Sequence, residues 1–172
     1  MLKAVSLIAF SLSVLLAFCG TEAKGFCFDD AAKKYELSAD LLRAIARTES
    51  GMRANAVNRN SNGSFDIGVM QINSFWFPKF GLTADQLKSD PCLNVMTGAD
   101  ILSRCVKSHG YTWEAVGCYN AYSHAKRVAY SWRIYRNLKA DAKRVDTVPR
   151  EKTAVPEKRN SSLHFVVRDQ EI

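Results

Sequence analysis

The segment 38–51 constrains the fold of this chain most strongly, because its apolar residues follow the period of an α-helix and end on an acid. Leu42 and Ile45 share one helical face, and Glu49 falls on that face one turn after Ile45. The apolar face of such a helix packs against the rest of a domain. The pattern therefore predicts a helix whose buried side ends in a carboxylic acid.

Local signals define both ends of this helix. Ser38 can accept a hydrogen bond from the free amides of the first turn, and Asp40 suits the positive end of the helix dipole. Gly51 can adopt the left-handed conformation that ends many helices. We therefore predict a helix that starts at Ser38 and ends at Glu49.

The acid at position 49 has two interpretations. Burial disfavours the charged form of a carboxylic acid, so its pKa rises from about 4.3 toward neutrality, where it can donate a proton. A glycosidase needs such an acid to protonate the bond that it breaks. A glutamate in the last turn of a helix can also turn into water, as most glutamates do. The helix alone leaves both interpretations of Glu49 open.

Two later segments are typical of a saccharide site. Residues 68–73 mix glycine, amide and apolar side chains after the turn-rich stretch 58–66, and residues 117–121 add a phenol and another amide. Amides offer donors and acceptors together, which suits sugar hydroxyls. Each segment also has a structural interpretation, in which Met70 belongs to the core and Asn120 ends a helix.

Four motifs follow one another in a fixed order: Glu49-Ser50, Gly68-Val69-Met70-Gln71, Tyr119-Asn120-Ala121 and Tyr130. Because it carries these motifs in this order, the chain resembles the specialised lytic transglycosylases, which have a goose-lysozyme-like catalytic domain. The resemblance covers about residues 25–139. It is closest to the small single-domain members that accompany type III and type IV secretion, conjugation and type IV pilus machines. The chain departs from the family pattern at two positions. Val69 stands where the family usually has leucine, and Tyr122 stands where it has glycine. The second replacement changes the local turn.

The resemblance implies a mainly α, lysozyme-like single domain with little or no β-structure. In this family one glutamate, here Glu49, protonates the bond between N-acetylmuramic acid and N-acetylglucosamine. It then takes a proton from the muramoyl C6 hydroxyl as that hydroxyl attacks C1, which gives a 1,6-anhydro sugar without a metal or cofactor. Asp66 is the nearby second carboxylate that would permit hydrolysis instead. We interpret Asp66 as a residue that fixes its loop.

The resemblance also implies a substrate-binding set, which comprises Ser50, Met70, Gln71, Tyr119, Asn120 and Tyr130. Gln71 is expected to line the site, and Tyr119 and Asn120 to contact sugar or orient the acid. Ser50 is expected to help fix the end of the helix.

Tyr130 has two interpretations. The resemblance implies a hydrogen bond near Glu49. The surrounding sequence instead offers a place in the core, because an apolar helical stripe is formed by Val128, Trp132, Tyr135 and Leu138.

The start of the chain predicts export. Residues 1–23 combine a basic start with an apolar run that is shorter than the roughly 20 residues of a membrane-spanning helix, as in a signal peptide. Small residues before Lys24 suit cleavage there, and cleavage before Gly20 is the second choice. Phe18 is too large for a lipoprotein site before Cys19. We expect a protein of the periplasm of a Gram-negative bacterium, with no stable membrane span after cleavage.

Removing the leader leaves an even number of cysteines, Cys27, Cys92, Cys105 and Cys118, which suits an oxidising compartment. Their spacing permits three pairings. Relatives in the family often carry cysteines only at the positions of Cys27 and Cys92, which implies that pair and leaves Cys105 with Cys118. A zinc site is not expected, because there is no Cys-x-x-Cys motif and the histidines are scattered.

The mature chain is predicted to form one domain over residues 24–139. Its further helical signals are a capping box at Thr83-Ala84-Asp85-Gln86, a stripe of Met96, Ala99, Leu102 and Val106, and a final run over 123–139. Residues 140–172 are rich in charges and include two prolines, which predicts a disordered tail. Its apolar patch, 163–167, has two interpretations, as a docking segment or as a frayed strand.

The formal charge of +7 favours an anionic partner. Peptidoglycan glycan strands fit an exported protein, whereas nucleic acid lies in the wrong compartment and no recognition motif is present. We expect a monomer that serves a secretion, conjugation or pilus apparatus. The alternatives are a non-catalytic wall-binding or assembly protein of such a machine and a muramidase-type hydrolase.

Overall fold

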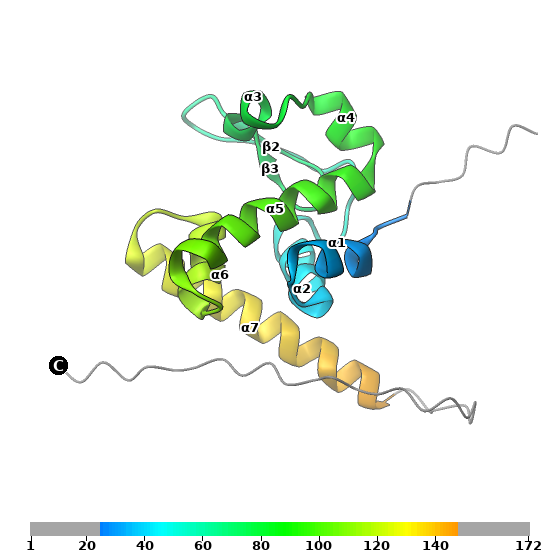
Figure 1. The fold of residues 1–172 in the computed structure, drawn as a ribbon, viewed down its shortest axis with the longest axis vertical. Helices are drawn as coiled ribbons and strands as arrows, with labels where there is room; N and C mark the ends of the chain where they lie inside the picture. Colours follow the sequence, from blue (N-terminus) through cyan, green and yellow to red (C-terminus); the bar gives the residue numbers. More distant parts are fainter. Residues whose placement is uncertain (1–24, 148–172) are drawn as a thin grey trace, which may run out of the picture.

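The computed structural model describes residues 25–147, with side chains described up to residue 140. This part is mainly helical, with a small sheet at one end (Figure 1). The helices are α1 (Phe28–Tyr35), α2 (Ala39–Ser50), α3 (Phe77–Phe80), α4 (Ala84–Ser89), α5 (Pro91–His109), α6 (Trp113–Asn120) and α7 (His124–Thr147), with a 3₁₀ turn η1 (Ser74–Trp76). The strands are β1 (Val57–Arg59), β2 (Phe65–Ile67) and β3 (Ile72–Asn73).

Helix α2 has the ends that the sequence predicts. The Ser38 side chain accepts a hydrogen bond from the Leu41 amide at 3.3 Å, and Gly51 ends the helix with a φ of 62°. Leu42 and Ile45 are completely buried. Because α2 packs against both α1 and α7, its apolar face lies in the core and its last turn is held in a fixed place.

Two disulfides join the helices around α5. Cys27 pairs with Cys92, which ties the start of α1 to the start of α5, and Cys105 pairs with Cys118, which ties α5 to α6. Both predicted pairs are confirmed. The predicted capping box is also present, because Thr83 and Gln86 exchange side-chain and backbone hydrogen bonds at the start of α4.

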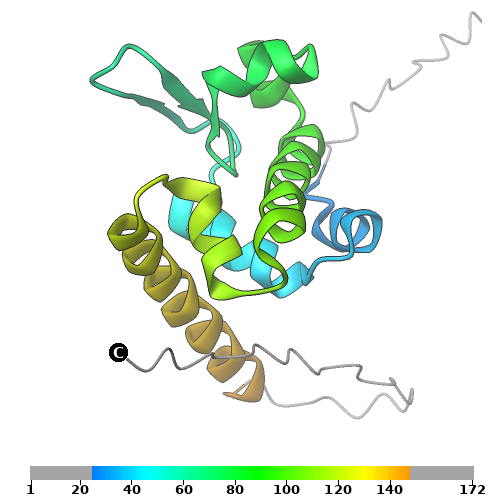
Figure 2. The ribbon, with the colours of Figure 1, turned by 60° about the vertical axis from the view of Figure 1, so that its left-hand side comes forward.

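The stretch 58–66, interpreted from the sequence as a loop, forms most of a β-hairpin. Asn58 pairs with Asp66 between β1 and β2, and Asp66 pairs with Asn73 between β2 and β3, so all neighbours are antiparallel. The hairpin projects from the helical body (Figure 2). β1 is wholly exposed, which explains why no alternation of apolar and polar residues marked it.

Helix α7 differs from its prediction in two respects. It continues to Thr147, past the expected end at Lys139, because no glycine or proline interrupts it before Pro149. The predicted apolar stripe is not the buried face, since the core residues are Tyr130 and Ile134, with Val128 40% and Trp132 59% exposed. The helix carries apolar residues on two faces, and periodicity does not say which one faces the core.

Some predictions fall outside the described residues. These are the signal peptide 1–23 and the part of the tail from 148 to 172, including the apolar patch 163–167. Within residues 25–147, no helix is both long enough and apolar enough to cross a membrane.

Candidate active site

A groove of about 840 Å³ lies where the end of α2 meets the small sheet and the end of α6. Four of the predicted site residues line it: Glu49, Gln71, Tyr119 and Asn120. Further lining residues come from the hairpin, β3, η1, α3 and the loop after α6, among them Asn60, Asp66, Asn73, Phe75, Trp76, Lys79 and Tyr122. The groove therefore brings together segments that are far apart in the sequence.

The Glu49 carboxyl is held in this groove by a phenol. Tyr130 donates a hydrogen bond from its hydroxyl to Glu49 Oε1 at 2.5 Å. Burial raises the pKa of Glu49 from 4.5 to about 7, and nearby Asp66 adds a smaller upward effect. The Tyr130 hydrogen bond and the charge of Arg133 lower the pKa in part. About half of the Glu49 carboxyls therefore carry a proton at neutral pH.

Tyr130 and Tyr119 form a pair of stacked rings beside Glu49, with centroids 6.4 Å apart. Tyr119 donates a hydrogen bond to the Met70 carbonyl at 2.7 Å. Burial raises the pKa of both phenols well above the usual value, and the charge of Glu49 raises it further. Both phenols therefore stay protonated and act as fixed donors. Tyr130 belongs to the core and also contacts Glu49, so both interpretations from the sequence apply.

Ser50 and Met70, predicted to contact substrate, are not among the residues that line the groove. The Ser50 hydroxyl is buried, 2.8 Å from the Val69 carbonyl oxygen and 3.1 Å from that of Ala46, and accepts from the Arg53 amide. It joins the end of α2 to the segment behind the groove. The expectation that Ser50 fixes the end of the helix agrees with these bonds.

The Met70 side chain is completely buried and packs on α5. It lies so close to Gly98 that a Cβ there would meet Met70 Cε at 2.8 Å. Tyr130 is likewise only 1% exposed, so its hydroxyl reaches Glu49 from the core instead of binding substrate directly.

Gln71 lines the groove in an unusual backbone conformation, with a φ of 49°. Its side-chain nitrogen donates to the carbonyl oxygens of Gly68 at 2.9 Å and Ala56 at 3.3 Å. Gln71 therefore stabilises the turn between β2 and β3, and its place at the groove follows from that turn.

Asp66 also lines the groove, but its carboxylate is engaged by amides. The side chains of Asn58, Asn60 and Asn73 donate to it at 3.2, 3.0 and 2.7 Å. These bonds hold the hairpin together, as expected for a residue that fixes its loop. A carboxylate held in this way is poorly placed to turn toward a sugar as a nucleophile or base.

Sequence reasoning missed the aromatic wall of the groove. Phe75 is 60% exposed and Trp76 is half-buried. The Lys79 ammonium lies 4.1 Å from the Phe75 ring centroid and 4.9 Å from that of Trp76. Flat apolar rings suit the faces of sugars. The run Ser74-Phe75-Trp76-Phe77-Pro78, directly after the predicted 68–73 motif, was the signal that could have revealed this wall.

Asn94 is a second residue that sequence reasoning missed. It is completely buried, and its side chain accepts from the Met70 amide and donates to the Ile67 and Leu87 carbonyls. Gly68 adopts a φ of 79°, and a Cβ there would lie 2.1 Å from Asn94 Nδ2. The glycine of the motif is thus required by both its conformation and this close approach. Among residues 25–147, no cluster of His, Cys, Asp and Glu is suited to a metal ion.

Residues 26–133 match the transglycosylase SLT domain family. The chain belongs to this family. Invasion protein IagB of Salmonella typhimurium is 44% identical over 123 residues, which cover 66% of this chain and 77% of the relative. Protein IpgF of Shigella flexneri is 41% identical over 130 residues, covering 72% and 86%. X polypeptide of Escherichia coli is 40% identical over 119 residues, covering 64% and 70%.

A solved structure agrees with the fold. An inactive mutant of the lytic transglycosylase Slt from Pseudomonas aeruginosa matches with a TM-score of 0.55 at 20% identity, covering 69% of this chain. The match covers 24% of that longer chain, so it bears on one domain and on the fold alone. The predicted family and the mainly α, lysozyme-like fold are confirmed.

Proposed function

We propose that the protein is a peptidoglycan lytic transglycosylase that cleaves the β-1,4 bond between N-acetylmuramic acid and N-acetylglucosamine and forms 1,6-anhydromuramic acid. The observation that carries the proposal is the environment of Glu49. Its carboxyl lines a groove of saccharide size, accepts a hydrogen bond from Tyr130, and has a pKa of about 7. Such a group can donate a proton and take one back at neutral pH.

The first step is general acid catalysis by Glu49. Its carboxyl proton passes to the glycosidic oxygen as the bond from C1 to that oxygen breaks, and N-acetylglucosamine leaves with a new hydroxyl. Positive charge then develops at C1 of the muramoyl sugar. The Glu49 carboxylate and Asp66 both line the groove and interact electrostatically, so negative charge is available to stabilise the developing cation.

The second step returns the proton to Glu49. The muramoyl C6 hydroxyl attacks C1, the new bond from C1 to O6 closes the anhydro ring, and the hydroxyl proton moves to the carboxylate. A well-oriented intramolecular hydroxyl can reach an effective molarity of about 10⁵ M or more. The scheme therefore requires neither a second enzyme carboxylate nor an activated water.

The hydrolytic alternative requires a second free carboxylate across the bond. Asp66 is the remaining acid among the described residues that line the groove. Three asparagine side chains already donate to it. This arrangement supports transglycosylation over muramidase-type hydrolysis.

The biological setting is part of the same proposal. One relative is named an invasion protein, and the motifs resemble small members that accompany secretion, conjugation and pilus machines. We propose that the protein acts in the periplasm and opens the wall locally for such a machine. The leader-like segment 1–23 and the charge of +7 are consistent with export and with an anionic polymer as substrate.

Digestion of purified peptidoglycan followed by mass spectrometry tests the chemistry. The parent protein should release muropeptides with 1,6-anhydro ends, and Glu49→Gln should release none while it still binds the wall. Glu36→Gln is the matched control, because Glu36 is exposed and lies at the end of α1. Reducing ends would show a hydrolase, wall binding without products would show a binding protein, and full activity of Glu49→Gln would exclude the assigned acid.

A further inference from the structure

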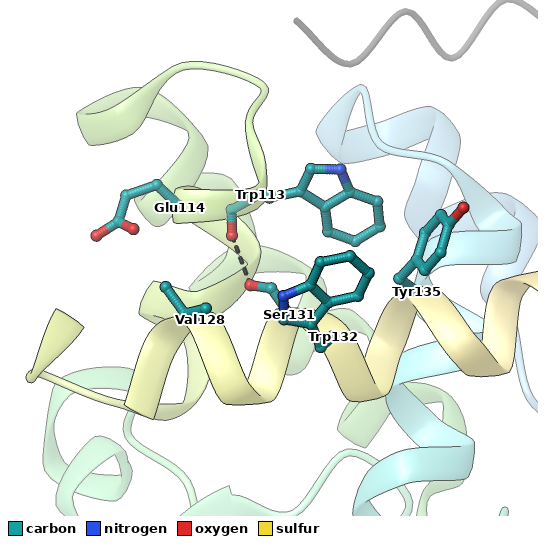
Figure 3. A pocket seen from close by; sticks show the side chains of 6 residues that line it. All are labelled: Trp113, Glu114, Val128, Ser131, Trp132 and Tyr135. Carbon is teal, nitrogen blue, oxygen red and sulfur yellow. Dashed lines mark hydrogen bonds between the residues drawn. The ribbon is translucent and has the colours of Figure 1, made fainter. Parts of the chain in front are cut away.

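A second concave surface lies on α6 and α7 and shares no lining residue with the groove. It is a pocket of about 390 Å³, lined by Trp113, Glu114, Val128, Ser131, Trp132 and Tyr135 (Figure 3). The catalytic chemistry proposed above uses none of these residues. The pocket therefore needs its own explanation.

The pocket is built from aromatic rings that remain accessible. The Tyr135 ring lies edge-on to both indoles, with centroids 5.7 Å from Trp113 and 5.6 Å from Trp132. Trp132 is 59% exposed, and Figure 3 shows the three rings grouped on one side of α7. A contiguous apolar surface of this kind marks a binding site.

Two of the polar side chains of the pocket are already engaged. The Ser131 hydroxyl donates to the Trp113 carbonyl at 2.7 Å, and Glu114 accepts from Arg127 at 2.7 Å. An occupant that inserted a polar side chain would find few free partners here. The pocket therefore selects an apolar segment.

We propose that the occupant is the segment 163–167 of the same chain. Its sequence, Leu-His-Phe-Val-Val, is the longest apolar run after α7, and it offers one aromatic and three aliphatic side chains. Residues 148–162 before it are mostly polar or charged. A segment with this composition gains by leaving water, at roughly 1.5–3 kcal/mol for each large side chain that becomes fully buried.

The chain between the end of α7 and residues 163–167 is long enough to return to the pocket. From Tyr135 to the end of α7 at Thr147 the chain rises about 18 Å, at about 1.5 Å per residue. A flexible chain with the length of residues 148–162 would span about 20 Å on average. The linker thus matches the return path to the pocket, and under this condition the effective concentration of a tethered segment reaches about the millimolar range.

Charge favours the same arrangement. Between 124 and 139, α7 carries five basic residues and no acid: Lys126, Arg127, Arg133, Arg136 and Lys139. Arg168 follows the apolar run, and two acids, Asp169 and Glu171, come just after it, so residues 168–171 carry a net charge of −1. When 163–167 occupies the pocket, these acids lie within reach of the basic helix. A tethered, charge-matched segment has an advantage over a separate protein at ordinary concentration.

Hydrogen exchange of the full-length mature protein tests the proposal. In the parent, the amides of 163–167 should be protected at micromolar protein. Trp132→Ala should speed their exchange at least about tenfold, which is the factor expected when one large apolar contact is lost. Phe75→Ala is the matched control, since it removes another exposed aromatic residue and should leave the exchange unchanged.

A second measurement identifies the occupant and does not depend on the stability of the Trp132 variant. A photo-crosslinking phenylalanine analogue at position 165 should join, within one molecule, to peptides that contain Trp113 or Trp132. Three results would overturn the proposal: no protection of 163–167 in the parent, protection that Trp132→Ala leaves intact, or crosslinks that join two copies or another part of the chain.

Discussion

Replacing Glu49 by glutamine should make the protein more stable at pH 8. The carboxyl is held in a groove where burial penalises its charged form, and burial is the main reason that its pKa lies near 7. Glutamine has nearly the same shape, carries no charge, and keeps an oxygen that can accept the Tyr130 hydrogen bond. The substitution therefore removes a penalty without creating a cavity.

The magnitude follows from the pKa of Glu49, which is raised from 4.5 to about 7. At about 1.36 kcal/mol per pKa unit, the charged form costs the folded state about 3 kcal/mol. Solvent in the groove screens part of this, so we expect a gain of about 2 to 3 kcal/mol. Below pH 4.5 the carboxyl is protonated in both folded and unfolded chains, and no penalty exists. Stability is lost as the pH rises from about 4.5 to about 7, because in this range the folded chain holds a proton that the unfolded chain has released.

Urea unfolding at pH 4 and pH 8 measures this difference. Glu49→Gln should match the parent at pH 4 and exceed it at pH 8, with unchanged m-values. Glu36→Gln should differ from the parent by less than about 0.5 kcal/mol at both pH values, because Glu36 is exposed. An equal effect of Glu49→Gln at both pH values, or destabilisation at pH 8, would refute the account of a charged carboxylate penalised by burial.

Three further predictions test the site. kcat/KM should fall about tenfold per pH unit above pH 7, because Glu49 loses its proton there. Tyr130→Phe should move this falling part of the pH profile to higher pH, because the phenol hydrogen bond lowers the pKa of Glu49. A pH profile of Tyr130→Phe that falls at the same pH as the parent, or at a lower pH, would contradict this role of Tyr130. Asn94→Ala should lower the free energy of unfolding in urea by about 3 kcal/mol or more, since three buried backbone groups lose their partner; a loss below 1 kcal/mol would be inconsistent. Tyr122 lines the groove and is 97% exposed, so its ring should stack on substrate. Tyr122→Gly should therefore raise KM about 2- to 10-fold at unchanged kcat, whereas Tyr122→Phe should leave KM unchanged. Equal KM values in steady-state assays of the three proteins would exclude that contact.

Local signals in the sequence were sufficient for the helix that carries the acid. Ser38, Gly51 and the face shared by Leu42, Ile45 and Glu49 act within a few residues of each other, so no tertiary information was needed. The disulfide pairs are different, because spacing alone permits three pairings and only the resemblance selected one.

The errors have physical causes as well. The strands of the hairpin are only three residues long and β1 is exposed, so its main signal was the Asn62-Gly63 turn, which is typical of hairpins. In α7, Trp132 and Tyr130 lie on different faces, and only contact with α2 and α6 makes Tyr130 the buried one. The groove itself depends on tertiary packing, because the end of α2, the sheet and the end of α6 meet only in the folded chain.

Several buried side chains support the site by holding the segment 67–70 behind the groove. Side chains from α2, α5 and α6 all bond to the backbone of residues 67–70: Ser50 to Val69, Asn94 to Ile67 and Met70, and Tyr119 to Met70. A buried carboxylate destabilises its surroundings, and movement of this segment would admit water and return the pKa of Glu49 toward its usual value. The bonds to residues 67–70 prevent that movement. The motif is therefore best understood as the support that keeps Glu49 both desolvated and accessible to a glycan.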